Sequence, residues 1–249
     1  MIIDTKSLNE QLDNQSATAI IAWVYETFSV SEVKLSTSFG AEGMVLMDLL
    51  IQAVKTPRIF TIDTGRNFQE TYDLWQEAIE RYGVKIETYY PDPADIFELV
   101  SQAGPNLFYE SVANRKQCCY VRKVKPLTAA LADAKVWISG LRRQQGQTRN
   151  DLDIVSWVEK YQVYKVCPLA NWFESNVWDY IRNNNVPYNK LHDQGFPTVG
   201  CAPCTRPVRP AEDLRSGRWW WETDEKKECG IHIVDGKIER KEPGIDYNI

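Results

Sequence analysis

A cysteine near the carboxyl end of the sequence has the surroundings of a nucleophile. Cys229 follows Lys226 and Lys227, precedes the small Gly230, and has His232 three residues further on. Positive neighbours favour the thiolate, which is the reactive form of the side chain. We therefore expect Cys229 to act as a nucleophile, and the alternative is an exposed cysteine without a role.

Four other cysteines form two pairs with the spacing of metal ligands. Cys118 and Cys119 are adjacent, and Cys201 and Cys204 form a C-x-x-C motif. Adjacent cysteines have poor geometry for a disulfide bond with each other. Four thiolates suit either zinc or an iron–sulfur cluster, and tetrahedral sulfur coordination admits both. The tandem pair favours a cluster, because zinc ribbons usually present two C-x-x-C motifs.

The remaining cysteine and one histidine receive structural interpretations. Cys167 ends an apolar segment and is expected to be a buried apolar side chain. His192 has no metal-ligand partner at a suitable spacing, so we interpret it as a loop residue held by polar neighbours.

Arginines and tryptophans are concentrated just before the segment that carries Cys229. Residues 206–222 contain four arginines and three consecutive tryptophans, Trp219 to Trp221. Arginine binds phosphate and sulfate groups in bidentate geometry, so this segment predicts an anion clamp. A solvated basic loop over an apolar patch is the alternative. Three consecutive tryptophans cannot all face one way, so some are expected to cover the metal centre or a nucleotide.

The composition is that of a globular protein and limits its partners. The chain has 249 residues, of which 43% are hydrophobic and 25% charged, and a net charge of −5. This acidic balance argues against a general nucleic-acid binder. No apolar run approaches a membrane span, and the first residues do not resemble a secretory signal. Six cysteines without an export signal predict a reducing compartment, the cytoplasm.

Strands alternate with helices along most of the chain. Two helices are predicted before and after the first strand, over residues 16–28 and 44–54, and a third over 68–82. Ser16 is a plausible N-cap. The five predicted strands are 33–37, 58–62, 84–90, 135–139 and 162–167.

This alternation predicts an α/β fold with a mostly parallel, twisted sheet and helices on both faces. Polar turns at 38–43, 63–67 and 140–149 follow three of the strands, so they should meet at one edge, where such sheets bind ligands. The first turn is rich in small residues and suits an anion, although it is not a Walker loop. We expect an α/β domain over residues 1–210 and a carboxyl-terminal tail over 211–249.

Taken together, these motifs resemble the assimilatory adenylyl-sulfate reductases within the phosphoadenylyl-sulfate reductase family. The matching segments span nearly the whole chain in family order: 36–42, 63–65, 118–124, 140–143, 200–204, 217–222 and 228–232. The resemblance implies an adenine nucleotide α-hydrolase-like sheet. One departure is Gly43, where many cluster-bearing relatives have Asp.

The resemblance also implies a reaction. Cys229 attacks the sulfur of adenylyl sulfate, AMP leaves, and the resulting S-sulfocysteine is reduced by thioredoxin or glutaredoxin with release of sulfite. His232 is expected to position the phosphosulfate group. A [4Fe-4S] cluster on Cys118, Cys119, Cys201 and Cys204 marks the members that accept adenylyl sulfate.

The substrate-binding residues implied by the resemblance fall into three groups. The anionic groups of the substrate are assigned to Lys123, Arg143, Arg149, Arg215 and Arg218. The turn Thr37, Ser38, Phe39 and Gly40 is assigned to the phosphate side, and Ile62, Thr64 and Gly140 to adenosine.

Other functions remain open at the level of sequence. They are a reductase that prefers 3′-phosphoadenylyl sulfate, a zinc-bearing nucleic-acid-binding module, and an ATP pyrophosphatase or sulfurtransferase on the same fold. The oligomeric state is also open, a homo-oligomer included.

Overall fold

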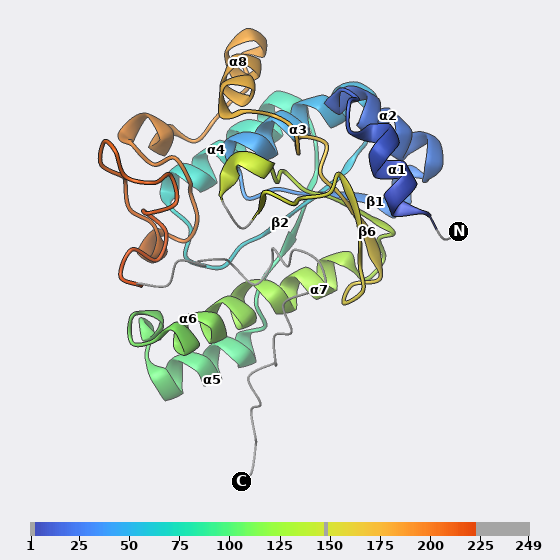
Figure 1. The fold of residues 1–249 in the computed structure, drawn as a ribbon. Coiled ribbons are helices and arrows are strands. Elements are labelled where there is room, and N and C mark those ends of the chain that lie inside the picture. The colour runs from blue at the N-terminus through green and yellow to red at the C-terminus, as the bar shows by residue number, and fades with distance from the viewer. Residues whose placement is uncertain (1–2, 147–148, 223–249) are drawn as a thin grey trace.

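The computed structural model describes residues 3–146 and 149–222, and its centre is a six-stranded sheet (Figure 1). The strands lie in the order β3-β2-β1-β4-β6-β5. All neighbouring strands are parallel except β5, which is antiparallel to β6. The predicted mostly parallel sheet is confirmed. The strands are β1 (Val33–Ser36), β2 (Arg58–Ile62), β3 (Ile86–Tyr89), β4 (Val136–Ile138), β5 (Val155–Val158) and β6 (Val163–Val166).

Five of these strands match the predicted ones to within two residues at each end, and β5 is missing from the predicted set. β5 is an edge strand with one partner, and Trp157 on it is 40% exposed. Its four residues include one serine, so its apolar pattern is too short to predict a strand by itself. Its hydrogen-bonded pairing with β6 makes it a strand, although its sequence does not indicate one.

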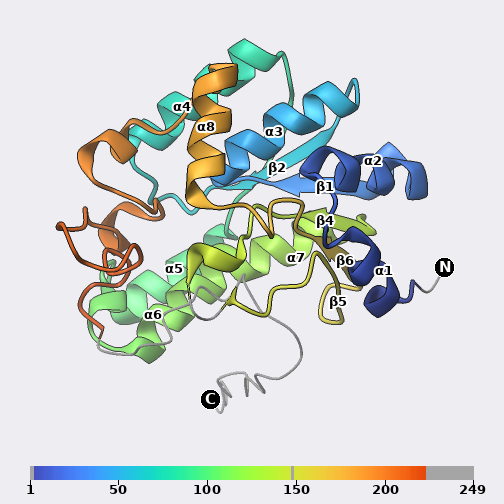
Figure 2. The same ribbon diagram turned by 45° about the horizontal axis from the view of Figure 1, so that its top comes forward.

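Helices cover both faces of the sheet (Figures 1 and 2). One face carries α2, α3, α4 and α8, while α5, α6 and α7 lie beyond the other. α1 packs beside β5, where Asn9 donates to the carbonyl of Val155 at 2.8 Å. The bounds are α1 (Thr5–Leu12), α2 (Ala17–Thr27), α3 (Ala41–Ala53), α4 (Gln69–Tyr82), α5 (Pro93–Ala103), α6 (Val112–Cys119), α7 (Lys125–Leu131) and α8 (Glu174–Asn184).

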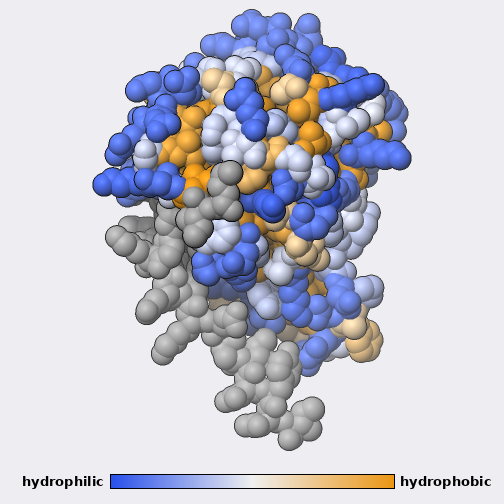
Figure 3. Space-filling model, turned by 90° about the vertical axis from the view of Figure 1, so that its right-hand side faces the viewer, coloured by the Kyte–Doolittle hydropathy of each residue, from blue (hydrophilic) through white to orange (hydrophobic). Residues whose placement is uncertain are grey.

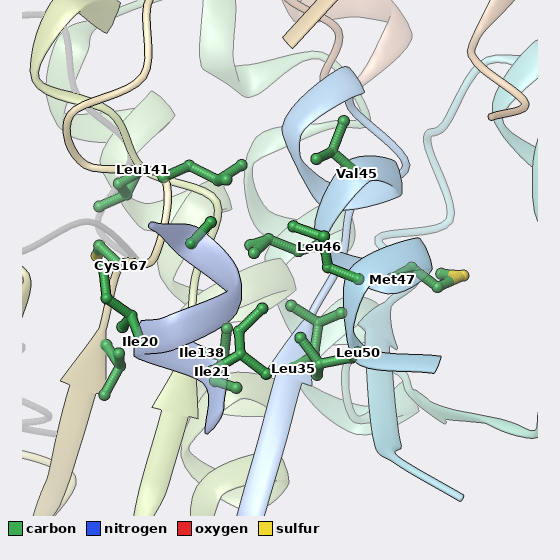
Figure 4. Close-up of a cluster of buried hydrophobic side chains, with 14 of the residues drawn as sticks. Ile20, Ile21, Leu35, Val45, Leu46, Met47, Leu50, Ile138, Leu141 and Cys167 are labelled. Atoms are coloured by element: carbon green, nitrogen blue, oxygen red, sulfur yellow. The ribbon is translucent and has the colours of Figure 1, made fainter. Parts of the chain in front are cut away.

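The main core lies between the sheet and α2 and α3 (Figure 4). Ile20 and Ile21 of α2 meet Leu35 of β1 and Ile138 of β4, and all four are almost fully buried. Burial of one such side chain stabilises the fold by roughly 1.5–3 kcal/mol. Cys167 belongs to the same cluster, which confirms its interpretation as a buried apolar residue.

Local signals fix the start of two helices. The Ser16 hydroxyl accepts from the backbone N–H of Ala19 at 3.1 Å, so Ser16 is the N-cap of α2, as predicted. The Asp92 carboxylate accepts from the N–H of Ala94 at 2.8 Å, and Pro93 occupies the first position of α5. Proline is favoured there because its missing N–H would have no partner in the first turn.

A π-helix, η3 (Tyr120–Val124), joins α6 to α7. The wider turn changes the direction in which successive side chains point, and such turns occur often at functional sites. Cys118 and Cys119 end α6, while Arg122 and Lys123 lie in η3. One continuous helical segment therefore carries two predicted metal ligands and one predicted substrate-binding residue.

The face beside α1 and α2 is mainly hydrophilic, with apolar residues showing between the polar ones (Figure 3). Within residues 3–146 and 149–222, no helix is both long and apolar enough to cross a bilayer.

Candidate active site

A cavity of about 260 Å³ lies at the carboxyl ends of the central strands. β1 pairs with β2 on one side and with β4 on the other, so the chain connections diverge between β1 and β4. Open α/β sheets bind ligands at such a point. The lining includes residues from all three predicted polar turns, among them Ser38, Thr64 and Gly140. The sequence therefore predicted the correct edge of the sheet.

The turn between β1 and α3 forms one wall of the cavity. Thr37, Ser38 and Gly40 line it, and Gly40 is the N-cap of α3 without a side-chain hydrogen bond. The first backbone N–H groups of a helix that lacks such a cap are suited to an anion. Phe39 does not line the cavity. Its side chain is buried and stacks on Trp75 with ring centroids 5.5 Å apart, so it anchors the turn.

Gly43 is required by the packing of this turn. A Cβ atom at position 43 would lie 2.8 Å from the Thr37 Oγ1, which is closer than a side chain can normally approach. The same Oγ1 accepts a hydrogen bond from the N–H of Phe39 at 3.0 Å. Aspartate at this position would therefore need a shifted turn, and glycine fits the turn as it stands.

Four of the five cations assigned to the substrate line the cavity: Lys123, Arg149, Arg215 and Arg218. They come from η3, from the segment after β4, and from the segment before Trp219. Arg149 is buried and donates to the side-chain oxygen of Gln145. Side chains distant in sequence thus place positive charge around one cavity, as an anionic ligand requires.

The structure directs the fifth cation, Arg143, away from the cavity. Its guanidinium donates to the Leu152 carbonyl at 2.8 Å and pairs with Asp13 at 3.1 Å. Arg142 lines the cavity instead and forms an ion pair with Glu42 at 2.7 Å. The backbone at Arg142 is extended, so neighbouring side chains point to opposite sides. The sequence Arg-Arg does not reveal which of the two faces inward.

Ile62, Thr64 and Gly140, which were assigned to adenosine, all line the cavity. Gly140 lies against α3, where an added Cβ atom would be 3.0 Å from the Glu42 Cβ. Thr64 lies at the boundary with the cysteines. Its hydroxyl is 3.3 Å from the sulfur of Cys201, and its carbonyl accepts from Arg122 at 2.7 Å.

The four paired cysteines meet in one buried cluster with Leu107, Phe108 and Trp219. Cys118, Cys119, Cys201 and Cys204 also line one small cavity beside the larger one, together with Arg122 and Arg218. The structure thus unites the tandem pair with the C-x-x-C motif. No group of three or more His, Cys, Asp or Glu side chains within the described residues is arranged to hold a single metal ion.

Burial raises the pKa of two of these thiols in the protein alone. It raises the pKa of Cys204 to about 12, with a further contribution from Cys201. Burial also raises the pKa of Cys118, against the opposing effect of Arg122. A bound metal centre would reverse this preference, because a coordinating thiol loses its proton.

The three tryptophans after Arg218 divide between interior and surface. Trp219 is 1% exposed and lines both cavities, whereas Trp220 is 47% exposed. Trp221 packs on Tyr109 with ring centroids 4.5 Å apart. Trp219 therefore covers the cysteine cluster on the side of the large cavity, in line with the expectation that part of this run covers a metal centre or a nucleotide.

Two predicted residues, Cys229 and His232, lie outside the described residues. Their placement stays a prediction. The last described residue, Glu222, is seven positions before Cys229.

Sequence reasoning assigned no site role to several polar residues that line the cavity, among them Glu42 and Arg142, and it interpreted His192, which also lines the cavity, mainly as a loop residue. His192 lies in a 3₁₀ turn, and its Nδ1 is 2.8 Å from the carbonyl oxygen of Phe196. Burial lowers the pKa of His192. Of these residues, Glu42 alone carried a sequence signal for the site, because it lies at the start of a helix that follows a polar turn.

Comparison with known proteins connects this geometry to a family. Residues 32–207 match the model of the phosphoadenosine phosphosulfate reductase domain. The chain is 44% identical to an adenosine 5′-phosphosulfate reductase of Allochromatium vinosum over 223 residues, 90% of this chain and 87% of that protein. It is 45% identical to an adenosine 5′-phosphosulfate reductase of Burkholderia cepacia, with coverage of 82% and 81%.

Solved structures agree on the fold. A phosphoadenylyl-sulfate reductase of Candida auris, crystallised with phosphate, superposes with a TM-score of 0.71 at 27% identity, covering 84% of this chain and 98% of that one. An FMN adenylyltransferase of Candida glabrata superposes with a TM-score of 0.56 at 16% identity, covering 94% and 80%. The second likeness concerns the fold alone.

Proposed function

The chain belongs to the phosphoadenosine phosphosulfate reductase family, and from this premise we propose that it reduces adenosine 5′-phosphosulfate to sulfite and AMP in sulfate assimilation. The observation that carries the proposal is the convergence of Lys123, Arg149, Arg215 and Arg218 on a cavity beside four clustered thiols. The names of relatives that are 44% and 45% identical support adenylyl sulfate as the substrate.

The proposed first step forms an S-sulfocysteine. The Cys229 thiolate attacks the sulfate sulfur, and the bond between that sulfur and the bridging oxygen breaks. AMP leaves with both electrons of that bond. The cations of the cavity stabilise the charge that develops on the leaving phosphate, and His232 positions the phosphosulfate group.

The second step consumes two electrons from a protein dithiol, thioredoxin or glutaredoxin. One thiolate of that dithiol attacks the adduct and releases sulfite, and its second thiolate then displaces Cys229 while the disulfide of the partner forms. The Cys229 thiolate is regenerated. A reducing cytoplasm suits this step, because it keeps the dithiol available.

Within the cavity, the roles follow from position. The turn at Thr37, Ser38 and Gly40 binds the phosphate side through its backbone N–H groups. Ile62, Thr64 and Gly140 border the adenosine, and Gly140 allows α3 to approach closely. Arg142 lines the cavity and takes the substrate-binding role that the sequence analysis assigned to Arg143.

The cysteine cluster fits a [4Fe-4S] centre by the chemistry of its donors. Cys118, Cys119, Cys201 and Cys204 would hold it. The Nε atoms of Arg122 and Arg218 are buried and find no acceptor within the described residues, so donors are available to an anionic cluster. When bound, such a centre supplies a fixed local charge next to the substrate cavity, tuned by its hydrogen bonds.

The reaction is tested by trapping its intermediate. The protein is mixed with adenosine 5′-phosphosulfate in the absence of any dithiol and weighed by mass spectrometry. We expect a sulfonate adduct on Cys229 and release of AMP, and neither in Cys229→Ser. An intact Cys229→Ser enzyme that still forms sulfite with thioredoxin would remove the proposed nucleophile.

The metal centre is tested separately by anaerobic purification, visible spectroscopy and counts of iron and sulfide. The proposal predicts iron and sulfide in equal amounts and a brown protein that keeps its colour in Cys229→Ser. Zinc without iron or sulfide would contradict the cluster.

The preference between the two nucleotides needs its own assay, because a related solved structure is named a phosphoadenylyl-sulfate reductase. Both nucleotides are supplied together and their consumption is followed. Preferential use of adenosine 5′-phosphosulfate is expected, and the reverse preference would assign the other substrate.

A further inference from the structure

A buried ion pair beside the cysteine cluster has no part in the function proposed above. The guanidinium of Arg115 donates to both carboxylate oxygens of Glu222, at 2.8 and 2.9 Å. The side chains are 3% and 2% exposed. Burial of a charge pair costs desolvation, so a pair of this kind needs good geometry and often serves a particular arrangement of the chain.

The pair connects two functional segments. Arg115 lies on α6, three residues before Cys118. Glu222 is followed, seven positions later, by Cys229. The carboxylate therefore belongs to the last described residue before Cys229, and the guanidinium lies on the helix that carries the tandem cysteines.

Trp219 is held at the centre of this arrangement. The Arg115 guanidinium lies 4.5 Å from the Trp219 ring centroid, and the Arg218 guanidinium lies 4.8 Å from it. The Trp219 carbonyl accepts from the N–H of Glu222 at 2.8 Å, and its own N–H donates to the Cys204 carbonyl at 3.2 Å. Contacts from α6, the C-x-x-C motif and the substrate cavity thus meet on one residue.

The backbone at Trp219 is in the left-handed region, with φ of 45°. A bulky side chain seldom adopts this conformation, and it persists only where the surroundings impose it. The strained backbone at Trp219 therefore indicates that packing around this residue fixes the chain that leads to Glu222.

The guanidinium of Arg218 packs directly against the backbone of Gly200. A Cβ atom at position 200 would collide with the Arg218 guanidinium, including a separation of 2.7 Å from its Nη1. Arg218 is therefore confined between the Trp219 ring and the Gly200 backbone while it lines the substrate cavity. Arg218, which lines the substrate cavity, and Arg115, which pairs with Glu222, therefore both pack on the ring of Trp219.

We propose that Arg115 and Glu222 are positioning residues, which fix the chain at residue 222, seven positions before Cys229, so that Cys229 meets a substrate held at Arg218. Seven residues of extended chain span at most about 25 Å, so an anchored Glu222 limits where residue 229 can travel. The inference rests on the proposed function in one respect, namely that Cys229 is the nucleophile.

Glu222→Gln tests the pair with a side chain of the same shape. At saturating substrate and without a dithiol, we expect the adduct on Cys229 to form about tenfold more slowly or worse, because a displaced nucleophile loses its alignment. The affinity for AMP, measured by calorimetry, should stay within about twofold, since AMP binding does not need the tail. Arg115→Met, which keeps an apolar stem over Trp219, should behave alike.

Glu87→Gln is the matched control. Glu87 also pairs with an arginine, Arg58, at 2.9 Å, but it lies on β3 away from the cavity. Its change should lower the unfolding temperature without slowing adduct formation by more than about twofold. A Glu222→Gln enzyme that reacts as fast as this control would overturn the proposal.

A second measurement does not depend on activity. Spin labels at Cys229 and at Phe97→Cys, an exposed position on α5, report the distance distribution between tail and domain by pulsed electron resonance. Glu222→Gln should broaden this distribution, and an unchanged distribution would contradict the anchor. If the unmutated protein forms no adduct on Cys229, the proposed function fails, while the distance measurement still decides on the anchor.

Discussion

Charged side chains are buried at both ends of the sheet, in two different arrangements. Near the amino ends of the strands, Lys34 is fully buried and contacts Glu87 at 2.9 Å and Asp133 at 2.7 Å. Arg58 pairs with the same two carboxylates, at 2.9 and 2.7 Å. Near the carboxyl ends, five cations of the described residues line a cavity of about 260 Å³: Lys123, Arg142, Arg149, Arg215 and Arg218.

The first arrangement holds the fold, and we propose that the second binds an anionic ligand. Although burial by itself lowers the pKa of Lys34, the hydrogen bonds that its ammonium donates to Asp133, Glu87 and Tyr89 raise it, so the ammonium is retained. At the opposite edge, Arg218 rests on an aromatic ring and Arg149 donates to a neutral amide. Carboxylates complete the first arrangement, and an anionic substrate would complete the second.

Arg218→Met should have the largest effect, and on activity. Loss of a charge-assisted contact to the substrate costs about 2–3 kcal/mol, a decrease of about a hundredfold in kcat/KM. The free energy of unfolding should change by less than about 1 kcal/mol, since methionine keeps the apolar stem over Trp219. Steady-state kinetics and urea unfolding on the same preparation check both. Retained activity would place the substrate elsewhere.

Lys34→Met should give the opposite pattern and a smaller change. It leaves Glu87 and Asp133 with Arg58 as their remaining cation, and both carboxylates are partly exposed, so we expect a loss of about 2 kcal/mol in the free energy of unfolding. kcat/KM should stay within about twofold, because Lys34 is at the other end of the sheet. A loss of activity as large as that expected for Arg218→Met, at unchanged stability, would contradict the assignment of Lys34 to the fold and not to the substrate site.

The smallest expected effect is on the pH dependence of stability in acid, at Asp133. The hydrogen bond from Lys34 is the main cause that lowers the pKa of Asp133 to about 2, against an ordinary value of 3.8. A carboxylate with a depressed pKa stabilises the folded state above its unfolded pKa, and this stabilisation is lost as the pH falls from about 4 to about 2. Unfolding measured by circular dichroism should therefore depend less steeply on pH in Asp133→Asn over this interval. An identical slope in both proteins would contradict the assignment.

The sequence predicted the sheet because its five main strands are separated by clear turns and helices. It also predicted the edge that holds the cavity, since the turns that contain Ser38, Thr64 and Gly140 each follow a predicted strand. Helices α5 to α7 were not predicted. Helix α5 could have been, because Ile96, Leu99, Val100 and Ala103 recur at helical spacing, whereas residues 112–125 combine polar, basic and cysteine positions without a clean apolar period. β5 was missed because pairing, not propensity, makes it a strand.

Composition and spacing indicated the chemistry proposed for this protein, through a lone cysteine among lysines, two cysteine pairs, and arginines beside tryptophans. These patterns are local and can be read along the chain. Tertiary structure alone decided that Arg142 and not Arg143 faces the cavity, that His192 and Glu42 line it, and that Arg115 meets Glu222. Such outcomes depend on packing between segments that lie far apart in the sequence. A short segment does not by itself determine how its side chains are oriented relative to a distant segment.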